Sequence, residues 1–245
     1  MTMKFGLQLY TLRRAFRDDP VATLERVAEL GYEEVEFAAP LDMDFAALRR
    51  RMDAAGLSAP SAHVGLDDLR QRPAEVLAMG EALGCRYLVL PYLTPEQRRW
   101  DEVIASLDGL ADMVAEKGFG FAYHNHDFEF EGPAGARPYD RLLAGTDPDR
   151  VGLELDLYWT RKAGEDPEEM LGRLRGRVKL VHLKDMAEDG DMADVGAGVM
   201  DYGRLLEAAR AAGAEHFIVE HDRPPDPWAS AAASLAHLRT ITRAA

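Results

Sequence analysis

Side chains that bind metal ions and move protons gather in four short segments of the second half of the chain. The segments read Tyr-His-Asn-His-Asp-Phe-Glu-Phe at 123–130, Glu-Leu-Asp-Leu-Tyr-Trp at 154–159, His-Leu-Lys-Asp at 182–185 and Ile-Val-Glu-His-Asp at 218–222. Together they offer carboxylates and imidazoles but no thiolate, a donor set that suits Mn²⁺, Mg²⁺, Co²⁺ or Zn²⁺. A bound cation would also relieve the repulsion between several carboxylates in one pocket.

Alternation along extended segments predicts which of these side chains share a face. Residues two apart in a strand point the same way, and the intervening positions here are mostly leucine and valine, which are expected to face covering helices. The polar side chains are therefore predicted to point into one shared opening. The pairs that share a face are Glu154 with Asp156, His182 with Lys184, and His124 with His126.

Eight strand-like segments alternate with eight helix-like segments along the chain. Strands are expected at 4–10, 34–38, 57–63, 87–91, 119–126, 151–157, 178–183 and 216–220. Helical spacing of apolar residues follows each of them, at about 20–30, 45–55, 73–83, 100–117, from 138, 167–174, 202–212 and 228–243. Gly31, Gly56 and Gly84 are expected to end their helices as left-handed caps. With no spare element, this order predicts parallel strands joined by right-handed crossovers.

The predicted fold class is α/β, a single (β/α)8 TIM barrel that forms one domain over 1–245. Eight units in 245 residues match the usual size of such a barrel. An open doubly wound sheet is the alternative, but its glycine-rich phosphate motif is absent after the first strand. In a TIM barrel the active site lies at the C-terminal ends of the strands, where Tyr10, His63 and the four polar segments are expected.

Composition and charge predict a soluble, cytoplasmic protein that binds neither nucleic acid nor membranes. The formal charge of −14, from 43 acidic and 29 basic residues, repels phosphate backbones and anionic membrane surfaces. The first residues show no signal-peptide pattern, and no apolar stretch approaches the ~20 residues of a membrane span. Cys85 is the only cysteine, which excludes an internal disulfide, and it is expected to be a small buried residue.

The four segments together resemble the sugar phosphate isomerase/epimerase superfamily of xylose isomerase-like barrels, which includes D-tagatose 3-epimerases, hydroxypyruvate isomerases and inosose dehydratases. The resemblance covers essentially the whole chain. It implies one divalent metal ion per chain, held by an acid on strand five and by Asp156, His182 and Glu220 on the next three strands. On strand five this chain has His124 where family members often have glutamate. Either His124 replaces that ligand or Glu129 reaches in from just beyond, and Glu129 is favoured.

The resemblance implies an isomerase or epimerase that acts on a small sugar, keto-sugar or polyol through an enolate next to a carbonyl. In such chemistry a metal holds substrate oxygens while two glutamates on opposite sides pass the proton, and similarity suggests Glu220 and Glu129 as that pair. Lys184 is expected to hydrogen-bond a substrate hydroxyl or the enolate, with an ion pair to Asp185 or Asp156 as the alternative. The residues expected to contact the sugar are Tyr10, His63, His126 and Trp159, the last with plain packing as its alternative.

Other functions stay open. Dehydration of a keto-cyclitol or keto-sugar in the same site needs only a general acid at the leaving group, as in the inosose dehydratase relatives. A nuclease similar to endonuclease IV is disfavoured by the −14 charge and by only seven histidines. A non-catalytic sugar-binding barrel would require a broken metal set. The expected partner is a small carbohydrate, and a homodimer is an option because relatives are often dimers.

Overall fold

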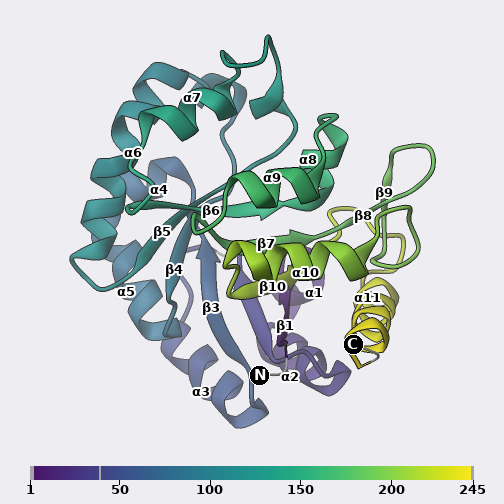
Figure 1. Ribbon diagram of the computed structural model, residues 1–245. Coiled ribbons are helices and arrows are strands. Elements are labelled where there is room, and N and C mark those ends of the chain that lie inside the picture. Colours follow the sequence, from purple (N-terminus) through teal and green to yellow (C-terminus); the bar gives the residue numbers. More distant parts are fainter. Residues whose placement is uncertain (1–2, 39, 244–245) are drawn as a thin grey trace.

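Eight parallel strands close into a barrel in the computed structural model, which describes residues 3–38 and 40–243 (Figure 1). Neighbours around the barrel follow the chain, and the first strand pairs with the last, in the order β1-β10-β7-β6-β5-β4-β3-β2. The strands are β1 Phe5–Gln8, β2 Glu34–Phe37, β3 Ser58–His63, β4 Tyr87–Leu90, β5 Gly120–His124, β6 Val151–Asp156, β7 Val178–Leu183 and β10 His216–Val219. The predicted (β/α)8 TIM barrel is therefore confirmed.

The helices that connect the strands form the outer layer of the molecule (Figure 1). The helices with predicted counterparts are α2 Pro20–Leu30, α3 Phe45–Ala55, α5 Pro73–Leu83, α6 Trp100–Ala115, α7 Pro138–Gly145, α9 Pro167–Arg173, α10 Tyr202–Ala212 and α11 Pro227–Arg243. Local chemistry sets their ends. Asp19 and Asp44 accept hydrogen bonds from first-turn N–H groups of α2 and α3, while Gly31 and Gly56 end these helices in the left-handed conformation. None of the helices within the described ranges is long and apolar enough to cross a membrane.

Several short elements lie in the loops that follow the strands. The expectation that the chain contains only eight strands and eight helices was therefore wrong. They are the helices α1 Arg13–Asp18, α4 Leu66–Gln71 and α8 Leu157–Lys162, the 3-10 turns η1 Pro95–Gln97 and η2 Phe128–Phe130, and the antiparallel pair β8 Asp185–Met186 with β9 Met192–Ala193. All the strands except β7 are also shorter than predicted, and β1 ends two residues before Tyr10. These segments form the rim of the barrel at the end where the polar side chains emerge.

The barrel interior changes from apolar to polar along its axis. Tyr87, Val89, Ala122 and Leu180 form a small buried cluster that is separate from the large apolar layer between sheet and helices. Because their strand neighbours, such as Leu88, belong to the large layer, this small cluster fills the middle of the barrel. Toward the C-terminal ends of the strands the inward positions are polar, with Gln8 and Ser61 beside acidic residues and histidines.

The single cysteine, Cys85, is buried where α5 gives way to β4, as predicted for a structural residue. Burial, aided by the charge of Glu36, raises the pKa of its thiol to about 12. Since only the thiolate reacts, we expect native protein to label extremely slowly with a disulfide reagent at pH 8, and unfolded protein to take up one equivalent at once. Fast labelling of the native protein, measured by release of the chromophore, would contradict this.

Candidate metal centre

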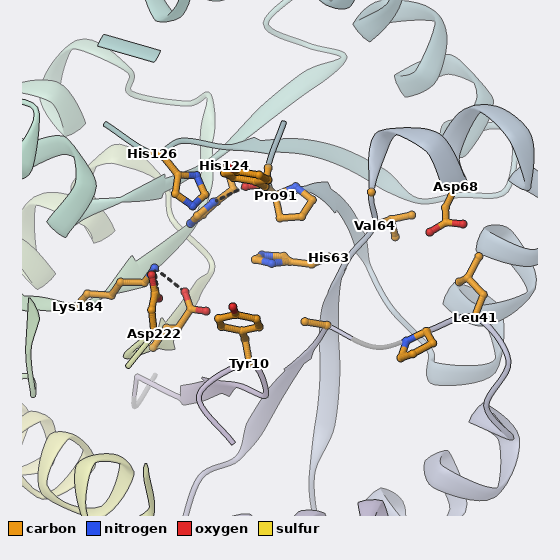
Figure 2. A pocket seen from close by; sticks show the side chains of 15 residues that line it. Tyr10, Leu41, His63, Val64, Asp68, Pro91, His124, His126, Lys184 and Asp222 are labelled. Atoms are coloured by element: carbon orange, nitrogen blue, oxygen red, sulfur yellow. Dashed lines mark hydrogen bonds and ion pairs between the residues drawn. The ribbon is translucent and has the colours of Figure 1, made fainter. Parts of the chain in front are cut away.

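A cavity of about 500 Å³ opens at the C-terminal ends of the strands. Its polar lining comes mainly from the later strands and its apolar lining mainly from the loops after β2, β3 and β4. Figure 2 shows the two sides, with His63 between them: His124, His126, Lys184 and Asp222 on one side, and Leu41, Val64 and Asp68 on the other. Of the polar residues predicted from strand alternation, His124, His126 and Lys184 line this cavity, whereas Glu154, Asp156 and His182 are buried and are not part of its lining.

Four buried residues at the polar side could hold a metal ion: His124, Asp156, His182 and Glu220. They come from the ends of β5, β6 and β7 and from the residue after β10, and each offers one ligand atom within 4.8 Å of the others. The Nε2 of His124 lies 3.2 Å from Asp156 Oδ2, and the Nδ1 of His182 lies 3.0 Å from Glu220 Oε2. Two imidazoles and two carboxylates suit the divalent metals named above.

The surrounding hydrogen bonds direct one nitrogen of His124 and one oxygen of Asp156 toward the centre of this cluster. The Nδ1 of His124 lies 3.0 Å from the Pro91 carbonyl, which can only accept, so Nδ1 donates to it and Nε2 is the nitrogen directed at Asp156. Asp156 in turn accepts from the N–H of Trp159 through Oδ1, as the N-cap of α8, and turns Oδ2 toward the cluster. In a neutral His124 the Nε2 lone pair is available to a cation beside Asp156 Oδ2, so these residues fit a metal ion.

The ammonium of Lys184 already supplies one positive charge to this cluster. Its Nζ lies 2.9 Å from Asp156 Oδ2, 2.6 Å from Glu220 Oε2 and 3.0 Å from Asp222 Oδ1. Burial acts to lower the pKa of Lys184, but the facing carboxylates of Asp156 and Glu220 raise it well above its usual value. Although burial opposes it, Lys184 likewise helps to hold the pKa of Asp156 well below its usual range. Ionised carboxylates are the form that binds metal.

Glu129, the strand-five residue favoured from the sequence, lies outside this group. Its Oε1 accepts from the Tyr123 hydroxyl at 2.7 Å and its Oε2 from the N–H of His126 at 2.8 Å. Strand β5 ends at His124, and η2 then turns Glu129 back onto Tyr123, which belongs to the layer outside the barrel. Burial in this place raises the pKa of Glu129 to about 7. The structure therefore places His124 with the other three residues, and it does not put Glu129 opposite Glu220.

Of the other residues predicted for the site, some line the cavity and some do not. Tyr10, His63 and His126 line the cavity. Trp159 is not part of the lining, because the chain turns into α8 after Asp156; its ring instead contacts His126, with the Lys184 Nζ 5.7 Å from the ring centre. The ion pair suggested between Lys184 and Asp156 is present, whereas Asp185 binds backbone N–H groups of the following loop, including those of Gly196 and Gly198.

Two buried acids face the cluster from deeper in the barrel. Glu36 and Glu154 are both inaccessible to solvent, and with His63 and His182 they form a second group within ligand distance of one another. Glu154 shares the face of Asp156, as alternation predicted. Glu36 was missed, although Glu34 and Glu36 alternate with Val35 and Phe37 in the sequence. Acids that alternate with apolar residues in a buried strand require cationic or hydrogen-bonding partners inside the barrel.

Comparison with known proteins places the chain in a family. Residues 24–241 match the family described as Xylose isomerase-like TIM barrel, and the chain belongs to it. It is 33% identical over 154 residues to an inosose dehydratase of Geobacillus thermodenitrificans and 29% identical over 197 residues to that of Geobacillus kaustophilus. These matches cover 55% and 68% of this chain but only 50% and 62% of those proteins.

Solved structures give the same fold over nearly the full length of the chain. A sugar phosphate isomerase/epimerase of Parabacteroides distasonis is 26% identical, with a TM-score of 0.83 over 97% of this chain and 98% of that one. A probable 3-DHS dehydratase of Bacillus anthracis is 14% identical, with a TM-score of 0.76 over 97% and 99%. The second likeness shows the fold alone.

Proposed function

We propose that this protein is a divalent-metal-dependent enzyme that removes a proton next to the carbonyl of a small keto-sugar or keto-cyclitol. The observation that carries the proposal is the buried group of His124, Asp156, His182 and Glu220, of which His124 and Glu220 line the cavity. When bound there, a divalent metal would supply a Lewis acid for the carbonyl oxygen. The inosose dehydratase and sugar isomerase/epimerase relatives support the class of substrate.

We further propose that the proton loss is followed by elimination, as in a dehydratase. Glu220 takes the α-proton, Lys184 hydrogen-bonds the oxygen on which negative charge develops, and both side chains line the cavity. The C–O bond to the β-hydroxyl then breaks, and His63, which also lines the cavity, gives that hydroxyl a proton so that it leaves as water. Epimerisation would require a second carboxylate across the substrate, and the expected one, Glu129, is held outside by Tyr123 and His126.

Isomerisation or epimerisation is the second candidate. It is favoured by Asp222, a second carboxylate that lines the cavity, and by the likeness to the Parabacteroides distasonis sugar phosphate isomerase/epimerase. Asp222 and Glu220 are bound to the same ammonium, that of Lys184, so the two carboxylates lie side by side, whereas epimerisation needs bases on two faces.

The test is to incubate Mn²⁺-loaded protein with a panel of keto-cyclitols and keto-sugars in D₂O and to follow the products by mass spectrometry and proton NMR. Elimination gives a product lighter by one water, whereas isomerisation gives an unchanged composition with deuterium at the α-carbon. We expect Glu220→Gln to lose at least ~100-fold in rate, as for loss of a general base, and Glu129→Gln to stay near wild type. The same loss in Glu129→Gln would favour the two-glutamate epimerase instead.

A further inference from the structure

The imidazole of His182 lies between two separate acidic groups, one at each ring nitrogen. On the cavity side, its Nδ1 is 3.0 Å from Glu220 Oε2 and 3.8 Å from Asp156 Oδ2. On the inner side, its Nε2 is 2.7 Å from Glu36 Oε2 and 3.4 Å from Glu154 Oε2. The ring is inaccessible to solvent, so neither nitrogen has bulk water as an alternative partner.

The chemistry of imidazole determines what each nitrogen does when a metal is bound. A neutral histidine has one nitrogen with a lone pair and one that carries a proton. If Nδ1 binds the metal beside Asp156 and Glu220, Nε2 carries the proton. It then donates a hydrogen bond to its nearest acceptor, Glu36 Oε2. A second metal ion beside the inner acids could then not be bound by Nε2, because a protonated Nε2 has no free lone pair.

Glu36 is itself held in place for this contact. The Gln8 side-chain amide donates to Glu36 Oε2 at 2.7 Å, and the Nε2 of His63 lies 3.0 Å from the same oxygen. These partners come from β1 and β3, on either side of the strand that carries Glu36. The carboxylate is therefore fixed by two neighbouring strands and can fix the His182 ring in turn.

We propose that Glu36 is a positioning residue of the metal centre, which holds His182 with Nε2 protonated and Nδ1 directed at the metal; this inference rests on the metal site proposed above. A carboxylate that accepts from the far nitrogen of a metal-bound histidine fixes the ring and its tautomer and makes the coordinating nitrogen more basic. Glu36 does not touch the metal or the cavity, and its effect on metal binding passes through His182.

The same strand offers a matched control. Glu34, two residues earlier and also buried, places Oε2 3.0 Å from the Nδ1 of His216. This is the same type of carboxylate–imidazole contact, but His216 does not belong to the metal-binding group. Glu34→Gln therefore removes a buried charge from β2 without touching the support of a ligand.

The experiment measures Mn²⁺ affinity and stoichiometry by isothermal titration calorimetry for wild type, Glu36→Gln, Glu36→Asp and Glu34→Gln. We expect Glu36→Gln to weaken Mn²⁺ binding by about 10–100-fold, the range for loss of such a support, and Glu34→Gln to bind as wild type does. Glu36→Asp keeps the buried charge but moves the carboxylate away from the His182 ring. This variant should fold even if Glu36→Gln does not, and it should bind Mn²⁺ less tightly than wild type. In the Zn²⁺-loaded wild type, ¹⁵N NMR should show His182 protonated at Nε2.

Several results would overturn the inference. One is equal affinity of wild type and both Glu36 variants; another is a His182 that binds Zn²⁺ through Nε2. A stoichiometry of two ions in wild type that falls to one in Glu36→Gln would mean that the inner acids bind an ion themselves. If wild type takes up no Mn²⁺, the proposed function fails and this inference fails with it. If wild type binds Mn²⁺ but the Glu36 variants show no specific loss of affinity, only this inference fails.

Discussion

Replacing Asp156 with asparagine is expected to abolish tight metal binding and, with it, the proposed reaction. The Oδ2 of Asp156 lies 3.2 Å from the His124 ligand nitrogen and 3.8 Å from that of His182, so it is the carboxylate that joins the two imidazoles. Asparagine keeps the Oδ1 that accepts from the N–H of Trp159, so the cap of α8 and the fold should persist. We expect at least a ~100-fold loss of Mn²⁺ affinity, measured by calorimetry, since the ligand charge is removed outright.

The control for Asp156→Asn is the same change at an N-cap that does not belong to the metal-binding group. Asp166 caps α9 by accepting from the N–H groups of Glu168 and Glu169, and these bonds are exposed to solvent. Asp166→Asn should bind Mn²⁺ with wild-type affinity, because it changes only a cap. If Asp156→Asn binds Mn²⁺ as tightly as wild type does, the group of His124, Asp156, His182 and Glu220 is not the metal site.

The architecture was predictable because the physical signals of a TIM barrel are local and repeated. Each strand-helix unit carries its own apolar spacing, and glycines such as Gly31 and Gly56 mark helix ends without reference to the rest of the fold. Alternation within β6 and β7 also placed Asp156 and His182 on the inward face. Since the strands of such a barrel all end at one rim, the sequence alone is enough to group residues that are far apart in the chain.

What the sequence could not show is the direction of the chain once a strand ends. Glu129 lies five residues beyond His124, and only the turn η2 decides that its carboxylate meets Tyr123 rather than the cavity. Trp159 was expected at the end of a strand but lies in α8. Glu36 was missed for a different reason: its role depends on partners from three other strands, and no pattern within β2 identifies them.

Replacing Lys184 with methionine is expected to destabilise the metal-free protein strongly. The ammonium is 1% exposed and is the cation between Asp156, Glu220 and Asp222, so its loss leaves three carboxylates facing one another. Removing one partner of a buried ion pair costs about 3–5 kcal/mol of unfolding free energy. For a chain of this length that corresponds to a fall in Tm of about 10 °C, measured by differential scanning calorimetry after treatment with a chelator.

Added metal should reverse much of this loss. A divalent ion bound to the native state alone stabilises it by about 2.7 kcal/mol at a free concentration 100 times its Kd, and it neutralises the carboxylates that Lys184 had paired. The rise in Tm with Mn²⁺ should therefore be larger for Lys184→Met than for wild type, where the ion must compete with the ammonium. Lys179→Met is the control, since Lys179 lies on the same strand but donates to the Gly176 carbonyl at an exposed position. An unchanged Tm in metal-free Lys184→Met would mean that the three carboxylates do not depend on this ammonium.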